Sequence, residues 1–132
     1  LKTKLGCVSK RPKLLAMEVR GRSLISGLPK TLQVTSDEMY EAMSEVSGTI
    51  VDSVKNVLEE TPPELVSDIS NRGIILTGGG ATMYGFGELI RSQTGIKTVI
   101  ASEPDECVAQ GTGKALENIS LLKTYNERRA AR

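Results

Sequence analysis

The residues best suited to hold a ligand are three consecutive glycines, Gly78, Gly79 and Gly80, which follow a short apolar run. The run at residues 73–77 has the length and β-branched content of a buried strand. Glycines adopt backbone angles closed to other residues, and they carry no Cβ that would keep a ligand from the main chain. The segment therefore fits either a cradle for an anionic or nucleotide ligand, or a turn that uses glycine only for close packing.

The composition narrows the chemistry that this chain can perform. Histidine is absent from the 132 residues, which excludes Ser-His-Asp and Cys-His catalysis and the commonest metal ligand. Cys7 and Cys107 lack the spacing of zinc sites and are interpreted as structural thiols. The 17 basic and 16 acidic residues nearly cancel, so nothing favours nucleic acid as a partner. No catalytic residue and no metal ligand is predicted.

The glycines must be positioned by the elements on either side of them. The pattern predicts a helix at residues 82–94, closed by Gly95, whose free N–H groups and positive dipole end would face the glycines. A second strand is predicted at residues 97–101. Because strand–helix–strand crossovers are right-handed, the two strands are expected to be parallel.

In the N-terminal part, the alternation of apolar residues predicts an antiparallel strand pair at residues 14–20 and 30–35. The basic loop at residues 9–13 is expected to be a solvated turn rather than a binding patch.

A long helix is predicted to follow this strand pair. Thr35 and Glu38 have the spacing of a capping box, so the helix is expected to begin here and to run to about residue 60. Its predicted inward stripe is apolar and recurs at helical spacing. The stripe consists of Met39, Met43, Val46, Ile50, Val54 and Val57.

Two more helices complete the pattern. One is predicted at residues 63–69, started by a proline, and another from Glu106, capped by Ser102. The basic tail at residues 123–132 is expected to be frayed. Two parallel strands do not make a stable sheet by themselves. The chain also begins without an initiator Met. Both features indicate a piece of a longer protein. Its free sheet edge is expected to be covered by self-association or to be partly disordered.

Several of these stretches, at consistent spacing over nearly the whole chain, closely resemble the MreB family of bacterial actin homologues. They are PPELVSDI at residues 62–69, RGIILTGGGA at 72–81, and CVAQGTGKALE at 107–117, with EVRGR at 18–22 and GLPK at 27–30 upstream. The resemblance implies an α/β fold, part of an actin-like ATPase domain of the actin, Hsp70 and sugar kinase type. It places residues 1–36 in subdomain IIB, as the antiparallel strand pair. Residues 37–132 would form the second half of subdomain IIA, with the last helix directed toward subdomain IA.

The resemblance also implies a set of binding residues. Gly78, Gly79 and Gly80 match the adenosine motif of the superfamily, and Lys2 matches the lysine of a Glu-x-x-Lys element beside the adenine and ribose. Met83 or Tyr84 would border the base, by similarity to the residues that follow the paired glycines of eukaryotic actin. The glutamate of the Glu-x-x-Lys element would precede residue 1, and Lys2 also fits a solvated lysine without a ligand.

The function implied is that of an ATP-binding, filament-forming cytoskeletal protein that organises cell-wall elongation and rod shape. ATP, with Mg²⁺ in the intact protein, would be the cofactor, and the parent would hydrolyse it slowly. The fragment alone is expected to be inactive, because the phosphate loops and catalytic residues would precede it. Expected partners are further copies, a RodZ-like adaptor and cell-wall elongation proteins at the inner face of the cytoplasmic membrane. Membrane contact would come only from the absent N-terminal half.

Two other functions share these sequence features. A sugar kinase or an Hsp70-type chaperone has the same fold and a glycine-rich adenosine motif, and a pure interaction module would use the glycines only as a turn.

Overall fold

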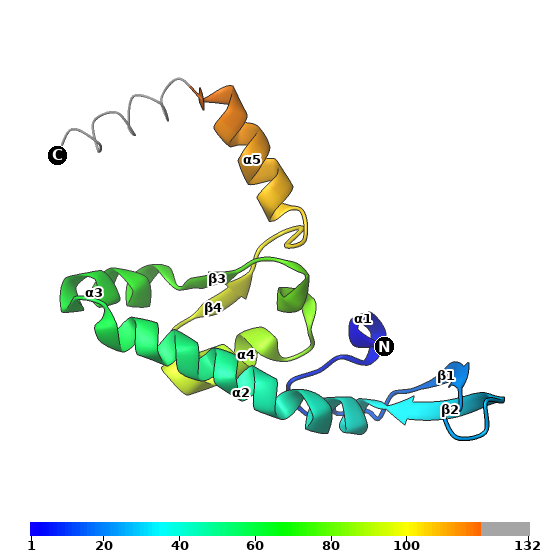
Figure 1. Cartoon of the computed structure of the whole chain (residues 1–132). Helices are drawn as coiled ribbons and strands as arrows, with labels where there is room; N and C mark the ends of the chain where they lie inside the picture. Colours follow the sequence, from blue (N-terminus) through cyan, green and yellow to red (C-terminus); the bar gives the residue numbers. More distant parts are fainter. Residues whose placement is uncertain (120–132) are drawn as a thin grey trace.

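The computed structural model describes residues 1–119, so the predicted basic tail lies outside the described residues. In Figure 1 the β1–β2 hairpin and α3 lie at opposite ends of the long helix α2, and α5 extends away from the rest. The elements are, in chain order, α1 (Lys2–Leu5), β1 (Ala16–Arg22), β2 (Pro29–Thr35), α2 (Ser36–Glu60), α3 (Pro63–Arg72), β3 (Ile74–Leu76), the 3-10 helix η1 (Gly79–Thr82), α4 (Phe86–Thr94), β4 (Thr98–Ile100) and α5 (Cys107–Glu117).

The predicted antiparallel pair is present, but its first strand lies two residues further along the chain than expected. β1 pairs with β2 from Ala16 opposite Thr35 to Arg22 opposite Pro29. The predicted strand ends at residue 20, but the tight turn that follows Arg22 keeps this residue in the ladder. The Ser23 N–H donates to the Leu28 carbonyl at 2.9 Å, which closes the turn just beyond Arg22.

The capping box at the start of α2 is confirmed. The Thr35 hydroxyl accepts a hydrogen bond from the Glu38 N–H at 3.3 Å, and the Glu38 carboxylate accepts one from the Thr35 N–H at 2.7 Å. The hydrogen bond from the Thr35 backbone lowers the pKa of Glu38 below its ordinary value. This contribution to stability is therefore present above the ordinary carboxyl pKa and is lost as the pH falls through the lowered one.

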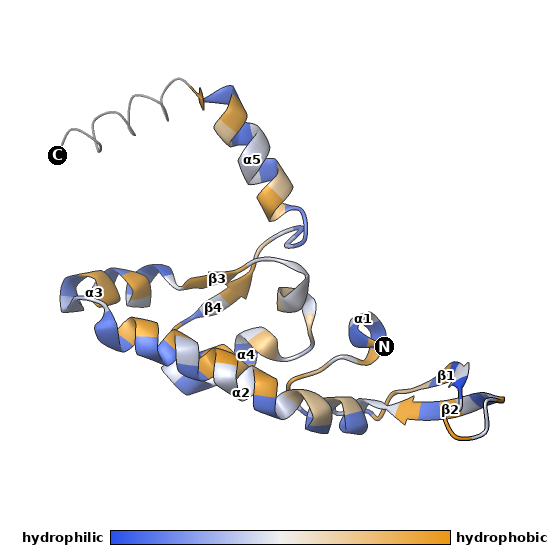
Figure 2. Ribbon diagram, in the orientation of Figure 1, coloured by the Kyte–Doolittle hydropathy of each residue, from blue (hydrophilic) through white to orange (hydrophobic). Residues whose placement is uncertain are grey.

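The prediction of which face α2 buries was wrong in part. Val54 of the predicted stripe packs against the core, as expected. Ser47 and Val51 are buried, whereas Val46 and Val57 of the predicted stripe keep 62% and 63% of their surface exposed. The reason is that α4 and the N-terminal segment cover only one side of the helix, and part of the apolar stripe lies on another side (Figure 2). That stripe borders a mostly apolar hollow of about 400 Å³ between α2, α3 and β3. Its lining residues are Ile50, Ser53, Val54, Val57, Leu58, Ile69 and Ile74.

The strand–helix–strand unit forms the centre of the molecule. β3 and β4 are parallel, with Ile74 opposite Thr98, as predicted. Phe86 and Ile90 of α4 pack with Val8 and Val51 to make the buried core. The predicted helix 82–94, however, begins only at Phe86.

The late start of α4 has a backbone cause. Gly85 has φ +84°, in the left-handed region, which a continuing right-handed helix does not allow. The segment before it forms η1, a short 3-10 helix, and then the extended residue Met83.

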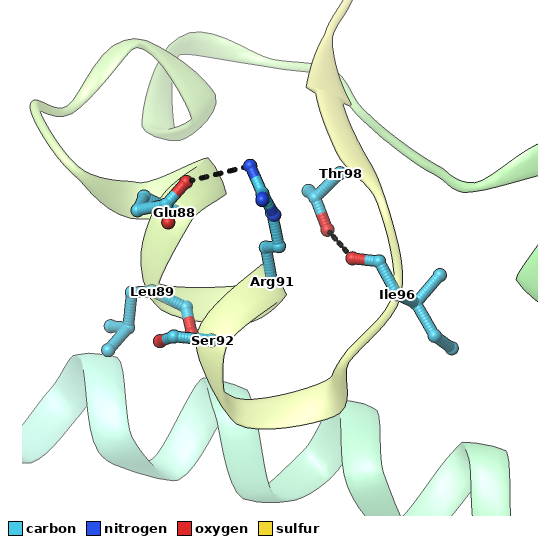
Figure 3. A network of polar contacts seen from close by, with 6 residues as sticks. All are labelled: Glu88, Leu89, Arg91, Ser92, Ile96 and Thr98. Carbon is cyan, nitrogen blue, oxygen red and sulfur yellow. Dashed lines mark hydrogen bonds and ion pairs between the residues drawn. The ribbon is translucent and has the colours of Figure 1, made fainter.

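The end of α4 agrees with prediction. Gly95 has φ +73° and its N–H donates to the Arg91 carbonyl at 2.9 Å, which ends the helix at a glycine C-cap. Figure 3 shows the neighbouring polar contacts: Arg91 pairs with Glu88 at 3.6 Å, and the Thr98 hydroxyl donates to the Ile96 carbonyl at 3.1 Å. Both charged side chains are well exposed, so the ion pair contributes little stability.

The last two predicted helices differ from expectation at their ends. The helix predicted at residues 63–69 continues to Arg72, because Gly73 with φ +89° is the first residue that leaves the helix. α5 begins at Cys107, and Ser102 does not cap it because a turn at Glu103, which has φ +50°, separates the two.

Both cysteines are free thiols. Cys7 is buried and donates to the Ser36 carbonyl at 3.2 Å, which supports its structural interpretation.

Candidate functional site

Four of the five predicted binding residues surround one hollow of about 290 Å³. Lys2 comes from α1, Gly79 and Gly80 come from η1, and Met83 directly follows η1. The remaining lining residues are Thr3 and Thr82. The fold therefore brings the N-terminal lysine to the glycine run, although the two are far apart in sequence.

The fifth predicted residue, Gly78, has a different role. It is absent from the lining of the hollow, and its N–H donates to the Pro104 carbonyl at 2.5 Å. Its φ of +83° lies in the left-handed region. Gly78 is therefore a glycine required by the turn that leaves β3.

Gly79 and Gly80 have neither a left-handed backbone nor a close neighbour that would require a glycine. Their φ angles are not positive, and a Cβ built on either one meets no atom within 4 Å. Neither the backbone conformation nor close packing against this chain explains a glycine here, so the close-packing interpretation does not apply to these two residues. What the two glycines do provide is open space and bare backbone beside Lys2 and Met83.

The expected contribution from a helix dipole was wrong. α4 begins at Phe86, beyond the hollow, so its N-terminus does not follow the glycines directly. Within η1 the Ala81 N–H donates to the Gly78 carbonyl and the Met83 N–H to the Gly80 carbonyl. The charged side chain lining the hollow is that of Lys2, and the lining contains no carboxylate. The hollow therefore offers a single positive charge, which is few charged groups for a cluster of phosphates.

A backbone pairing holds the two walls of the hollow together. The Val8 N–H donates to the Tyr84 carbonyl at 3.0 Å, and the Tyr84 N–H donates to the Gly6 carbonyl at 3.4 Å. Tyr84, expected as one possible neighbour of the base, is not part of the lining. Sequence reasoning missed this pairing, because it joins distant segments through backbone groups that nearly every residue carries.

Other kinds of site were also sought in the part of the chain that the structure describes. Residues 1–119 contain no cluster of three or more side chains that could hold a metal ion. No helix within this range is both long and apolar enough to cross a membrane.

Comparison with known proteins gives the family. A family model described as "MreB/Mbl protein" matches residues 1–124. The chain belongs to the MreB/Mbl family. It is 46% identical over 122 residues to the cell shape-determining protein Mbl of Bacillus cereus, which covers 92% of this chain and 37% of that protein.

Solved structures agree with the family and the fold. The chain superimposes on MreB5 of Spiroplasma citri bound to ADP with a TM-score of 0.82 and 34% identity, covering 89% of this chain and 36% of that one. A MamK double helical filament gives a TM-score of 0.63 at 18% identity, covering 79% of this chain and 31% of that one, and so supports the fold alone. The fold prediction is confirmed: the chain is part of an actin-like fold. It spans about a third of the length of these MreB/Mbl relatives.

Proposed function

We propose that this chain supplies the adenosine side of an ATP site in a filament-forming, actin-like protein that organises cell-wall elongation and rod shape. The observation that carries the proposal is the hollow beside Gly79 and Gly80, where two glycines leave open space opposite Lys2. The ADP of the MreB5 structure supports a nucleotide as the ligand, and the name of the Bacillus relative supports a role in cell shape.

The remaining parts of the proposal concern the whole protein. Mg²⁺ and the phosphates would be held by residues that this chain does not supply, so the chain alone would not hydrolyse ATP. The whole protein would be a slow ATPase at the inner face of the cytoplasmic membrane, with a RodZ-like adaptor and cell-wall elongation proteins as partners. Membership of the MreB/Mbl family favours this function over a sugar kinase or an Hsp70-type chaperone.

Adenosine and ATP should bind this chain with similar, weak affinity, with dissociation constants of about 1 mM. The reason is that the hollow offers one lysine and bare backbone but no phosphate loop. The measurement is an NMR titration of the chain with adenosine, AMP and ATP in turn, following the amide signals of Gly79, Gly80 and Met83. Guanosine provides the control for base recognition.

Two results would contradict the proposal. Shifts confined to residues outside the hollow would show that the nucleoside binds elsewhere. A much higher affinity for ATP than for adenosine would show that this chain holds the phosphates, and the assignment to the adenosine side would be wrong.

Self-association is the second part of the proposed function, and two surfaces support it. Within the described residues β3 and β4 pair only with each other, which leaves an unpaired edge on each strand. Beside β3 lies the mostly apolar hollow that contains Val57, whose side chain is 63% exposed. A soluble protein rarely leaves such surfaces uncovered.

The sedimentation coefficient of the chain should therefore rise with protein concentration. Val57→Lys should weaken this association, because it places a charge in the apolar hollow, whereas Asn56→Lys adds the same charge at an exposed polar residue next to it. Analytical ultracentrifugation of the three proteins tests this. A chain that sediments as a monomer at every concentration would overturn the self-association part and leave the nucleoside titration unaffected.

A further inference from the structure

Arg11 lies in the basic loop but does not behave as a solvated turn residue. Its guanidinium carbon lies 4.3 Å from the centroid of the Tyr84 ring, and its Nη2 donates to the Gly6 carbonyl at 3.5 Å. Its Nε is buried and has no hydrogen-bond partner among the described residues. Leaving such a group unpaired costs free energy, so the contacts that hold Arg11 in this position must offset that cost. Lys10 and Lys13, on the same loop, are exposed.

The contacts of Arg11 fall on the backbone pairing that joins the two walls of the hollow. Gly6 directly follows α1, which carries Lys2, and Tyr84 directly follows Met83. We call the set Gly6, Val8, Arg11 and Tyr84 the clasp. Its two backbone hydrogen bonds are between Val8 and Tyr84 and between Tyr84 and Gly6. Arg11 binds both sides of the clasp at once, the Tyr84 ring on one side and the Gly6 carbonyl on the other.

We propose that Arg11 is a positioning residue for the nucleoside hollow, which it keeps at a fixed width by fastening α1 to the segment that follows η1. The proposal rests on the proposed function, because it assigns the hollow to a nucleoside. The two residues that Arg11 contacts, Gly6 and Tyr84, do not line the hollow, so Arg11 acts on the hollow through them. A hollow whose walls are held in place before binding loses less conformational entropy when the ligand enters.

The geometry separates this role from two others. A cation placed to bind phosphate would present its guanidinium to the hollow, whereas that of Arg11 stacks on an aromatic ring outside it. A residue that stabilises the core would pack among Val8, Val51, Phe86 and Ile90, and Arg11 is not one of them.

The test compares adenosine affinity in matched variants by NMR titration. Arg11→Gln and Tyr84→Leu should each weaken adenosine binding about two- to fivefold, the effect expected for a stacked cation near the surface. Tyr84→Phe keeps the ring and should bind as the wild type does. Lys10→Gln and Lys13→Gln remove the same charge from the same loop and should have no effect. The double variant Arg11→Gln/Tyr84→Leu should bind no more weakly than Arg11→Gln alone, because Arg11→Gln already removes the stacking contact with Tyr84.

Amide hydrogen exchange gives a second measurement that does not depend on a ligand. In Arg11→Gln the amides of Val8 and Tyr84 should exchange faster, while the amides of α2 and α4 keep their protection. Faster exchange throughout the chain would mean a merely structural role and would overturn the proposal. Unchanged exchange at Val8 and Tyr84 would overturn it as well. A wild-type chain that binds no adenosine would refute the proposed function, and the exchange data would still decide whether Arg11 fastens the clasp.

Discussion

Gly79→Val should reduce the affinity of the chain for adenosine by at least about tenfold, which corresponds to about 1.4 kcal/mol. The reason is steric. Gly79 lines the hollow, and a Cβ at this residue would enter open space, so the two methyl groups of valine would occupy volume that the ligand needs. Because that Cβ meets no atom of the chain within 4 Å, the free energy of unfolding should change little. The measurements are an adenosine titration and urea denaturation of the same protein.

The matched control is Gly113→Val. Gly113 is an exposed residue of α5, it is not part of the hollow, and a Cβ there also meets nothing within 4 Å. Adenosine affinity should therefore be unchanged in this variant. Equal affinity in wild type and Gly79→Val would show that the open space beside the glycines is not the binding site. Loss of binding together with loss of folding would show that Gly79 has a structural role that the geometry does not indicate.

The features that could be predicted from the sequence are those whose causes are local. The capping box at Thr35 and Glu38 and the C-cap at Gly95 depend only on neighbouring residues. The glycines at 79 and 80 were also visible as a candidate site, and the resemblance to a family connected them to Lys2. Only the structure could exclude close packing as the reason for these two glycines, because that reason depends on the space next to each of them.

The features that were missed depend on distant contacts. Helical periodicity identified an apolar stripe on α2, but it does not say which elements will cover that stripe, and the structure buries Ser47 while Val57 stays exposed. The same limit applies to Arg11, which a local pattern assigns to a solvated loop. Its contact with Tyr84 exists only because α1 and η1 are brought together.

Gly85→Ala should destabilise the chain by about 2–5 kcal/mol. Two costs add at this residue. Its φ of +84° lies in the left-handed region, where a residue with a Cβ loses about 1–2 kcal/mol. The new Cβ would also lie 1.9 Å from the Ser9 hydroxyl oxygen and 2.8 Å from the Ser9 Cβ, an overlap that typically costs about 1–3 kcal/mol. Urea denaturation measures the sum of the two costs.

Gly95→Ala separates the two costs. Gly95 has φ +73°, also in the left-handed region, but a Cβ there meets nothing within 4 Å, so only the conformational cost of about 1–2 kcal/mol should remain. Ser9→Gly in the Gly85→Ala background should recover part of the difference, since it removes both Ser9 side-chain atoms that collide with the new methyl group. Equal destabilisation by Gly85→Ala and Gly95→Ala would show that the segment containing Ser9 can move away at no cost. In that case the N-terminal segment is not held tightly against Gly85, and the hollow between α1 and η1 would have no fixed width.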